Sequence, residues 1–360
     1  MAPALPYFTL APFASLPIVS LHPEQLVMNP NQTIAVVIPS YRVKRHILGV
    51  IASIGPEVAR IYVVDDCCPD GSGAFVREQC SDPRVTVCQH EVNQGVGGAV
   101  MTGYAAAIAD GADVIVKVDG DGQMDASLIG SFVEPILAGE ADYTKGNRFY
   151  DLEQLGSMPP LRLFGNAVLS LMNKLSSGYW DVFDPTNGFT AIHADVARHL
   201  PMSKISRRYF FETDMLFRLN VLHAVVADVP MDAVYGDEVS NLKISRVVTE
   251  FMFKHVRNFF KRVFYNYYLR NMSLASIELP LGALGMVFGT VYGLIHLGAL
   301  DEGQAASAGV VMMAALPLLT GLQLVLAFLS YDINSVPRRP IHKLRRFSAL
   351  LRPDAPARLS

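Results

Sequence analysis

The stretch DVIVKVDGDGQ, residues 113–123, decides the fold of this chain. Its first half, Val114 to Val118, is short, apolar and rich in β-branched residues, which predicts a buried parallel strand. The strand then stops at alternating acids and glycines. Asp119, Asp121 and Gln123 are spaced two apart, so in an extended chain their side chains point the same way. The stretch therefore predicts polar oxygens gathered at the carboxyl end of a strand.

These oxygens form a candidate metal site. Two carboxylates and an amide oxygen suit a hard cation, and Mg²⁺ or Mn²⁺ usually keeps open positions for the phosphate oxygens of a substrate. Asp119, Asp121 and Gln123 are the predicted metal ligands. The alternative is an acidic turn in which Gly120 and Gly122 supply a permissive backbone.

Strand and helix signals alternate around this stretch. Strands are expected at residues 33–39, 61–65, 84–89, 114–118 and 143–146, and helices at 43–54, 74–79, 96–109 and 127–138. Alternation of this kind predicts an α/β domain whose mainly parallel sheet is covered by helices on both faces. Ligands of such sheets bind at the carboxyl ends of the strands.

Polar residues follow several of the expected strands at that edge. The first strand delivers Pro39, Ser40 and Tyr41, the second Asp65 and Asp66, and the third Asn93 and Gly95. Together with the acids after the fourth strand, these residues are expected to line one crevice.

Composition indicates that part of the chain lies in lipid. The chain has 360 residues, 51% of them hydrophobic, and a mean hydropathy of +0.28, which is too apolar for a purely soluble protein. The net charge of -3 hides an asymmetry, because basic residues concentrate in the last third. The four cysteines lack metal-ligand spacing, so free thiols in a reducing compartment are predicted.

Residues 246–270 have the pattern of an amphipathic helix. One arc of the helical wheel carries Met252, Phe253, Val256, Phe259, Phe260, Val263, Phe264 and Tyr267. The other side carries Lys254, Arg257, Lys261 and Arg262. A basic, aromatic-rich helix of this kind is typical of the lipid headgroup layer, and the alternative is a core helix of a soluble domain.

Two apolar segments then follow, and each is long enough to span a bilayer. Residues 279–300 and 303–331 contain no Asp, Glu, Lys or Arg over 22 and 29 positions. Basic residues flank the pair on both outer sides, which predicts a hairpin with both ends in the cytoplasm. Glycines at 282, 285, 289 and 293 form a stripe that predicts helix packing between chains, and hence a homo-oligomer.

Six motifs carry a resemblance to a known family. They are VVIPSY (36–41), VVDDCCPDGSG (63–73), NQGVGGAVMTGY (93–104), KVDGDGQMD (117–125), KGNRF (145–149) and DPTNGF (184–189). In this order and spacing, they resemble family 2 glycosyltransferases with a GT-A (Rossmann-like) fold. More narrowly, the chain is similar to polyprenyl-phosphate glycosyltransferases of the dolichol-phosphate mannose synthase type. It departs from the family where PSYRV and the inserted cysteines of DDCCPDGS stand.

The resemblance implies a nucleotide-sugar site and a role for the metal. Asp65 corresponds to the acid that contacts the nucleobase, and the DxDxQ motif holds the cation that bridges the donor diphosphate. The implied nucleotide-sugar contacts are Pro39, Ser40, Tyr41, Asp65, Asp66, Asn93, Gly95, Asp119, Asp121 and Lys243. Lys243 lies in SNLKIS, which matches the segment beside the diphosphate.

The resemblance also implies an acceptor site. Arg148, Arg162 and Asn166 match positions that contact the acceptor phosphate, and arginine suits this task because its planar fork binds phosphate bidentately. Glu212 and Asp214 lie among apolar residues on a predicted helix over 207–219, where related transferases carry an acid near the sugar. A capped helix start is the alternative for these two acids. The implied catalytic residues are Asp121, Arg148, Arg162, Glu212 and Asp214.

The expected activity is transfer of one sugar, with inversion, from a UDP- or GDP-linked sugar to undecaprenyl or dolichyl phosphate. No nucleic-acid partner is expected, and the enzyme would lie in the inner membrane if the chain is bacterial. One alternative is a processive polysaccharide synthase, but the QxxRW signature of such enzymes is absent and Trp180 is the sole tryptophan. The other is an inactive anchoring or regulatory subunit, which the intact DxDxQ disfavours.

The predicted organisation has five parts. They are an N-terminal extension (1–32), a GT-A catalytic domain (33–245), an interfacial helix (246–272), two transmembrane helices (273–333) and a basic cytoplasmic tail (334–360). The extension lacks a basic start and an uninterrupted apolar core, so it fits neither a signal peptide nor a membrane span.

Overall fold

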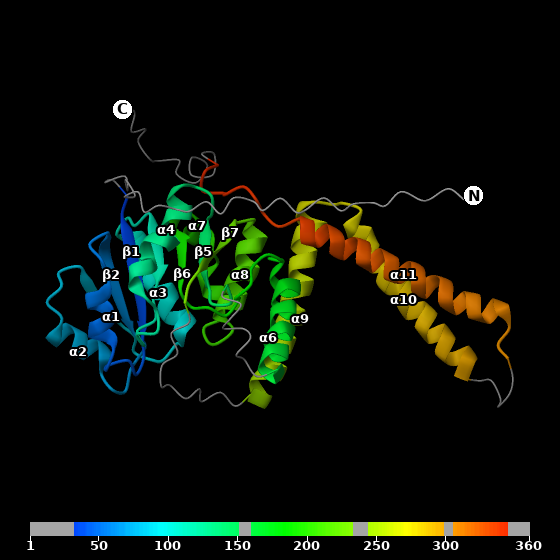
Figure 1. The fold of residues 1–360 in the computed structure, drawn as a ribbon, viewed down its shortest axis with the longest axis horizontal. Coiled ribbons are helices and arrows are strands. Elements are labelled where there is room, and N and C mark those ends of the chain that lie inside the picture. Colours follow the sequence, from blue (N-terminus) through cyan, green and yellow to red (C-terminus); the bar gives the residue numbers. More distant parts are fainter. Residues whose placement is uncertain (1–31, 151–159, 233–243, 299–304, 345–360) are drawn as a thin grey trace, which may run out of the picture. The chain divides into compact units, whose positions relative to one another are not determined.

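The computed structural model describes residues 32–150, 160–232, 244–298 and 305–344 (Figure 1). Within these ranges, the side chains of residues 160–164, 166, 244–248 and 297 are left undescribed. Contacts divide the chain into Met1–Gln32 and Thr33–Ser360, and all elements below belong to the second unit. The finer division into catalytic, interfacial and membrane parts stays a prediction.

A seven-stranded sheet forms the centre of this unit. Its strands are β1 Ile34–Ser40, β2 Val58–Asp65, β3 Val85–Gln89, β4 Val114–Lys117, β5 Tyr143–Asn147, β6 Thr190–His193 and β7 Val226–Pro230. The order across the sheet is β3-β2-β1-β4-β6-β5-β7. Only β6 runs antiparallel to its neighbours, so the predicted mainly parallel sheet is confirmed.

Helices cover both faces of the sheet, as predicted. They are α1 Ile47–Ser53, α2 Ser72–Gln79, α3 Val96–Ala109, α4 Ile129–Leu137, α6 Pro160–Ser177, α7 Ala194–His199 and α8 Phe211–Leu222. Val37, Tyr62 and Ile115 face a core that includes residues of α3, α7 and α8. On the other face, α4 packs against β4, β5 and β6, and its Phe132 stacks on Phe189 at 4.0 Å. The apolar run of β1 is buried on both sides, as expected of a central parallel strand.

Strand β6 determines which segments meet at the carboxyl ends of β4 and β5. It lies between these two strands, and its first residue, Thr190, pairs with Lys117 of β4 and with Lys145 of β5. Because β6 is antiparallel, its beginning rather than its end lies at this edge. The preceding turn, residues 183–189, therefore lies beside the segment that follows β4.

The chain after the sheet domain is helical. It comprises α9 Ile244–Phe264, the π-helical turn η3 Tyr265–Arg270, α10 Ala275–Gly298 and α11 Ala308–Asn334. Figure 1 shows α10 and α11 running side by side as a hairpin, and the two helices contact each other along their lengths. Residues 275–296 and 308–334 are long and apolar enough to cross a membrane, and most of their side chains are exposed.

The glycine stripe of α10 packs within the hairpin. A Cβ on Gly282 would lie 2.9 Å from the carbonyl oxygen of Gly321, and one on Gly289 would lie 2.5 Å from that of Ala314. Close backbone approach of this kind is what small residues allow between membrane helices. The stripe is thus used by α11 of the same chain, and the interpretation as a contact between chains is wrong for these glycines. A homo-oligomer remains a prediction, but the glycine stripe no longer supports it.

One basic residue of α9 is buried, contrary to expectation. The helical wheel predicts that Arg262 lies on the basic side of the helix, yet its side chain is only 2% exposed. It forms a bidentate pair with Asp332 of α11 at 2.6 and 2.9 Å. Tyr267 and Trp180 also donate hydrogen bonds to Asp332, at 2.5 and 2.9 Å. We call these four residues the Arg262–Asp332 junction. The helical wheel missed it because the partner lies 70 positions along the chain.

Further polar contacts hold α9 against the sheet domain. Asn258 donates to Asp214 of α8 at 3.1 Å, and His255 bonds Ser176 of α6 at 2.8 Å. The exposed face of α9 carries Phe253 and Phe260, which are 69% and 62% exposed. The predicted apolar arc is therefore divided, because Val263 and Tyr267 are buried together with the polar residues, whereas Phe253 and Phe260 are exposed.

After α11, the chain returns to the sheet domain. The buried carboxylate of Asp142, just before β5, accepts the backbone N–H groups of Ile341 and His342 at 2.9 and 3.1 Å. It also bonds Nδ1 of His342 at 2.6 Å, and the His342 ring stacks on His193 at 4.3 Å. The segments on either side of the hairpin are thus both fixed to the same domain.

Truncating Asp332 should destabilise the protein strongly. Asp332→Ala leaves the Arg262 guanidinium buried without its partner, which costs about 3–5 kcal/mol, whereas Arg262→Met with Asp332→Leu should recover much of that loss. Thermal unfolding in detergent measures both effects. The control is Glu250→Ala, which removes an ion pair with Lys254 at the surface of the same helix. A wild-type melting temperature for Asp332→Ala would contradict the importance of the junction.

Candidate functional site

The carboxyl ends of β1, β2 and β3 are in register. Ser40 pairs with Asp65, and Asp65 pairs with Gln89. Asp66 follows directly, and its backbone N–H donates to the carbonyl of Ser40 at 3.1 Å. The structure thus brings Ser40, Asp65 and Asp66 together as the sequence predicted.

Asp65 and Asp66 organise the loops around them. The Asp65 carboxylate accepts the N–H groups of Cys68 at 2.7 Å and Gly73 at 2.5 Å. The Asp66 carboxylate accepts those of Gln94 and Gly95, both at 2.7 Å. A Cβ on Gly73 would lie 2.6 Å from Asp65, so glycine is required where the loop crosses this carboxylate.

The Asp66 loop extends into a buried chain of side chains. His90 bonds Asp66 at 2.8 Å on one ring nitrogen and Thr102 at 2.8 Å on the other. Asn93 donates to the Asp66 carbonyl at 3.1 Å. These contacts fix the loops that follow β2 and β3, and direct contact of their residues with a nucleotide stays a prediction.

The segment after β4 turns instead of staying extended. Residues 120 and 121 form a turn, and Gly122 has φ +79°, a backbone conformation that favours glycine. The Asp121 carboxylate accepts the N–H of Gln123 at 3.0 Å, which closes the turn. The segment is therefore not extended, so the condition under which Asp119, Asp121 and Gln123 would point the same way is not met. Asp121 and Gln123 are both partly exposed, as is Asp119.

Lys117, the last residue of β4, is buried next to this turn. Its side chain is 1% exposed, and its ammonium contacts Asp119 at 2.8 Å, the carbonyl of Gly188 at 3.0 Å and Glu212 at 3.7 Å. Burial alone would lower the pKa of Lys117, but the nearby carboxylates of Asp119 and Glu212 raise it above its usual range. The lysine is therefore a charged group inside the site.

Lys145 occupies the matching position on β5. It is fully buried, and it donates to the carbonyl of Asn187. Burial lowers the pKa of Lys145 to about 8, against the opposing effects of Glu212 and Asp184. Two buried lysines thus bind consecutive carbonyls of the turn before β6.

Glu212 and Asp214 lie in the first turn of α8 but in different surroundings. Burial raises the pKa of Glu212, although Lys117 and Lys145 oppose this shift. Asp214 is 1% exposed and accepts Ser206 N–H at 2.8 Å, Arg218 at 3.2 Å and Asn258 at 3.1 Å. The structure places Glu212 beside the lysines, whereas the contacts of Asp214 join α8 to the preceding loop and to α9.

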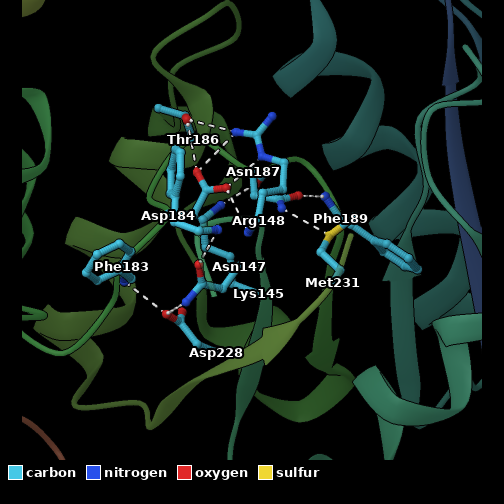
Figure 2. Close-up of polar contacts among 11 residues, drawn as sticks. Lys145, Asn147, Arg148, Phe183, Asp184, Thr186, Asn187, Phe189, Asp228 and Met231 are labelled. Carbon is cyan, nitrogen blue, oxygen red and sulfur yellow. Dashed lines mark hydrogen bonds and ion pairs between the residues drawn. The ribbon is translucent and has the colours of Figure 1, made fainter. Parts of the chain in front are cut away.

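Arg148 faces the buried Asp184, as Figure 2 shows. Its Nε and Nη2 donate to the two carboxylate oxygens at 2.7 and 3.1 Å, and Thr186 also donates to Asp184 at 3.2 Å. Burial alone would raise the pKa of Asp184, but Arg148 holds it below the usual range. The predicted acceptor-site arginine is therefore fixed by the turn before β6.

Asp228 of β7 lies at the base of the same cluster (Figure 2). It accepts the N–H of Phe183 at 2.9 Å and the side-chain amide of Asn147 at 3.2 Å. Burial raises the pKa of Asp228 to about 6. Sequence reasoning missed Lys117, Lys145, Asn147 and Asp228. The available signals were the charge of Lys117 at the end of an apolar strand and the place of Lys117, Lys145 and Asn147 in the motifs KVDGDGQMD and KGNRF.

Several predicted residues cannot be placed. Lys243 lies outside the described residues, and so do the side chains of Arg162 and Asn166, although their backbone belongs to α6. Among the described residues, no group of three or more His, Cys, Asp and Glu side chains could hold a metal ion. Asp121 and Gln123 offer oxygen donors of the right chemistry, and Asp119 shares its carboxylate with Lys117.

Comparison with known proteins identifies a matching family model and relatives with similar sequences. Residues 35–200 match the family model described as glycosyl transferase family 2. The chain is 30% identical over 186 residues to an undecaprenyl-phosphate mannosyltransferase of Micrococcus luteus, covering 51% of this chain and 75% of the relative. It is 26% identical over 221 residues to a UDP-N-acetylglucosamine–dolichyl-phosphate N-acetylglucosaminyltransferase of Methanococcus voltae, covering 58% and 88%.

A solved structure is also similar. It is the glucosyl-3-phosphoglycerate synthase of Mycobacterium tuberculosis in complex with Mn²⁺, UDP and glucosyl-3-phosphoglycerate, with a TM-score of 0.47 and 19% identity. The match covers 64% of this chain and 80% of that one.

Proposed function

The chain belongs to glycosyl transferase family 2, and from this premise we propose that it transfers one sugar from a nucleotide diphosphate sugar to a polyprenyl phosphate. One observation carries the proposal. Arg148 is fixed by the buried Asp184 on the same turn whose backbone contacts Lys117, next to the acids after β4. The turn of residues 183–189 thus lies between two groups. On one side is Arg148, a cation suited to an acceptor phosphate, and on the other are the acids after β4, which suit a donor diphosphate with its cation.

The acceptor chemistry explains why an arginine is needed. A phosphomonoester is already anionic near neutral pH, so the protein must position its oxygen rather than deprotonate it. The planar guanidinium of Arg148 suits phosphate, and Asp184 restricts its rotation. Attack by that oxygen on the sugar carbon, from the side opposite the leaving diphosphate, forms one bond as the other breaks and inverts the configuration. The names of the two relatives support this acceptor class.

The donor side fits a divalent cation by its chemistry. Asp121 and Gln123 supply oxygens at the turn after β4, and Mg²⁺ or Mn²⁺ is commonly held by one or two carboxylates with substrate phosphates and water completing the shell. When bound, the cation would neutralise the charge that develops on the leaving diphosphate. Asp65 and Asp66 would hold the loops around the nucleotide, and Glu212 would face the donor sugar.

The apolar helices would hold this site at the bilayer. We propose that α10 and α11 span the membrane, with the exposed aromatic side of α9 in the headgroup layer. The contacts of Asp332 and Asp142 support a hairpin with both ends on the side of the catalytic domain. The basic residues that flank the hairpin favour the cytoplasm for that side. A lipid acceptor would then meet the site at high local concentration.

Removing Arg148 should impair use of the lipid acceptor. In a transfer assay with UDP-N-acetylglucosamine, GDP-mannose and undecaprenyl or dolichyl phosphate, Arg148→Ala should lower kcat/KM for the acceptor by about 30- to 100-fold, because a charge-assisted bidentate contact is lost. Nucleotide affinity, measured by calorimetry, should change little. Arg198→Ala is the control, since this exposed arginine pairs with Asp195 on α7. Equal losses in nucleotide affinity and in acceptor use would reassign Arg148 to the donor.

Asp121→Ala should abolish metal-stimulated transfer. The variant removes a carboxylate assigned to the cation, so Mn²⁺ should no longer strengthen nucleotide binding in calorimetry, and EDTA should inactivate the wild-type enzyme. Asp125→Ala is the matched control, because Asp125 is an exposed acid nearby that accepts the N–H of Ser127. Undiminished transfer in EDTA would refute the metal assignment.

Cysteine labelling should place the start of α11 and the segment after its end on opposite sides of the membrane. With the native cysteines replaced, Ala305→Cys before α11 should react with an impermeant maleimide only from the side opposite the catalytic domain. Leu344→Cys, after α11, should react from the catalytic side, since that segment binds Asp142. Labelling of both positions from the same side would exclude a membrane-spanning hairpin.

A further inference from the structure

Lys117 joins three separate segments around the candidate site. Its ammonium contacts Asp119 after β4, the carbonyl of Gly188 in the turn before β6, and Glu212 on α8, at 2.8, 3.0 and 3.7 Å. The rest of β4 is Val114, Ile115 and Val116, all fully buried. A charged group thus ends a strand that is otherwise apolar, and its ammonium contacts residues of the candidate site.

Burial of a lysine is costly unless its charge is compensated. Taking an ammonium out of water is unfavourable, and only close acceptors and counter-charges offset this. Asp119 and Glu212 supply the counter-charges, and they would otherwise repel each other across the site. The ammonium therefore fixes the position of both carboxylates relative to one another.

The surroundings leave this arrangement little freedom. A Cβ on Gly188 would lie 2.5 Å from Asp119 and 2.6 Å from the Lys117 nitrogen, so the turn backbone packs directly on the ion pair. Side chains of Asp119 and Glu212 are 29% and 15% exposed, which leaves both able to meet a ligand. The buried ammonium of Lys117 thus holds the two carboxylates, and part of each acidic side chain remains accessible to solvent.

We propose that Lys117 is a positioning residue that sets the spacing between Asp119, at the donor diphosphate, and Glu212, at the donor sugar. The inference rests on the proposed function, which assigns those two acids to the two halves of the donor. When Lys117 holds Glu212 in this position, the carboxylate of Glu212 can accept hydrogen bonds from the hydroxyl groups of a sugar. Lys117 thereby links recognition of the sugar to the diphosphate end of the same substrate.

Lys145 provides a matched control for a merely structural role. Both lysines are buried, both lie beside Thr190 in the sheet, and both donate to a carbonyl of the same turn. Lys117 forms ion pairs with both Asp119 and Glu212, whereas Lys145 affects the pKa of Glu212 without lying within ion-pair distance of either carboxylate. If Lys117 only stabilised the turn, its removal and that of Lys145 should have the same effect on ligands.

The test compares binding of a nucleotide with binding of its sugar conjugate. Calorimetry on the full-length protein in detergent would use UDP against UDP-N-acetylglucosamine and GDP against GDP-mannose, with whichever pair the wild type binds. Lys117→Met should reduce the affinity gained from the sugar by about tenfold, as Glu212→Gln should, and the double variant should lose no more than either. Lys145→Met should retain the gain from the sugar.

A second variant guards against loss of folding. Lys117→Gln keeps a donor for the Gly188 carbonyl but removes the charge, and it should show the same loss at an unchanged unfolding midpoint. An unaltered gain from the sugar in both Lys117 variants, an equal loss in Lys145→Met, or additive losses in the double variant would overturn the proposal. So would a wild type that binds neither nucleotide sugar. Failure of the proposed function is seen separately, as a wild type that binds a nucleotide sugar but transfers nothing to the lipid phosphate.

Discussion

The antiparallel insertion of β6 between β4 and β5 is the constraint on which the site depends. A parallel strand would bring its end to the carboxyl edge, but β6 brings its beginning, and with it the turn of residues 183–189. Backbone carbonyls in such a turn need donors once they are buried. Lys117 and Lys145, from the two flanking strands, supply donors to Gly188 and Asn187. The sheet order thus explains why two lysines are tolerated in the interior.

This turn also connects the two sides of the reaction that we propose. Toward β4, its backbone packs on the Lys117–Asp119 pair. Toward β5, its Asp184 carboxylate holds Arg148, and its Phe183 N–H binds Asp228. A transferase that uses no covalent nucleophile depends on placing its two substrates accurately. A single turn that contacts residues on both sides of the site meets that requirement through packing and hydrogen bonds.

The hairpin is joined to the catalytic part by buried polar contacts. Arg262 and Asp332 pair within a site that is closed to water, and Tyr267 and Trp180 complete the hydrogen bonding of the carboxylate. Such a pair adds less stability than apolar packing would, but it tolerates no substitution of one partner alone. It also fixes one arrangement of α9 and α11, because a bidentate pair has a defined geometry. With Asp142 holding the returning chain, the hairpin is attached at both ends.

The sequence by itself determined the features that depend on neighbours along the chain. The alternation of strands and helices, the turn residues after β4 and the two apolar spans all follow from periodicity and composition over short windows. Together with the order of the motifs, this was enough for the α/β class and the family. Only the tertiary structure decided which distant residues meet. The orientation of β6, the burial of Lys117 and Lys145, the pairing of Arg262 with Asp332 and the use of the glycine stripe inside the hairpin depend on contacts between segments far apart in the chain. A charge in an apolar pattern indicates that a partner must exist, but its identity is a property of the packed fold, because desolvation is offset only where the two groups meet.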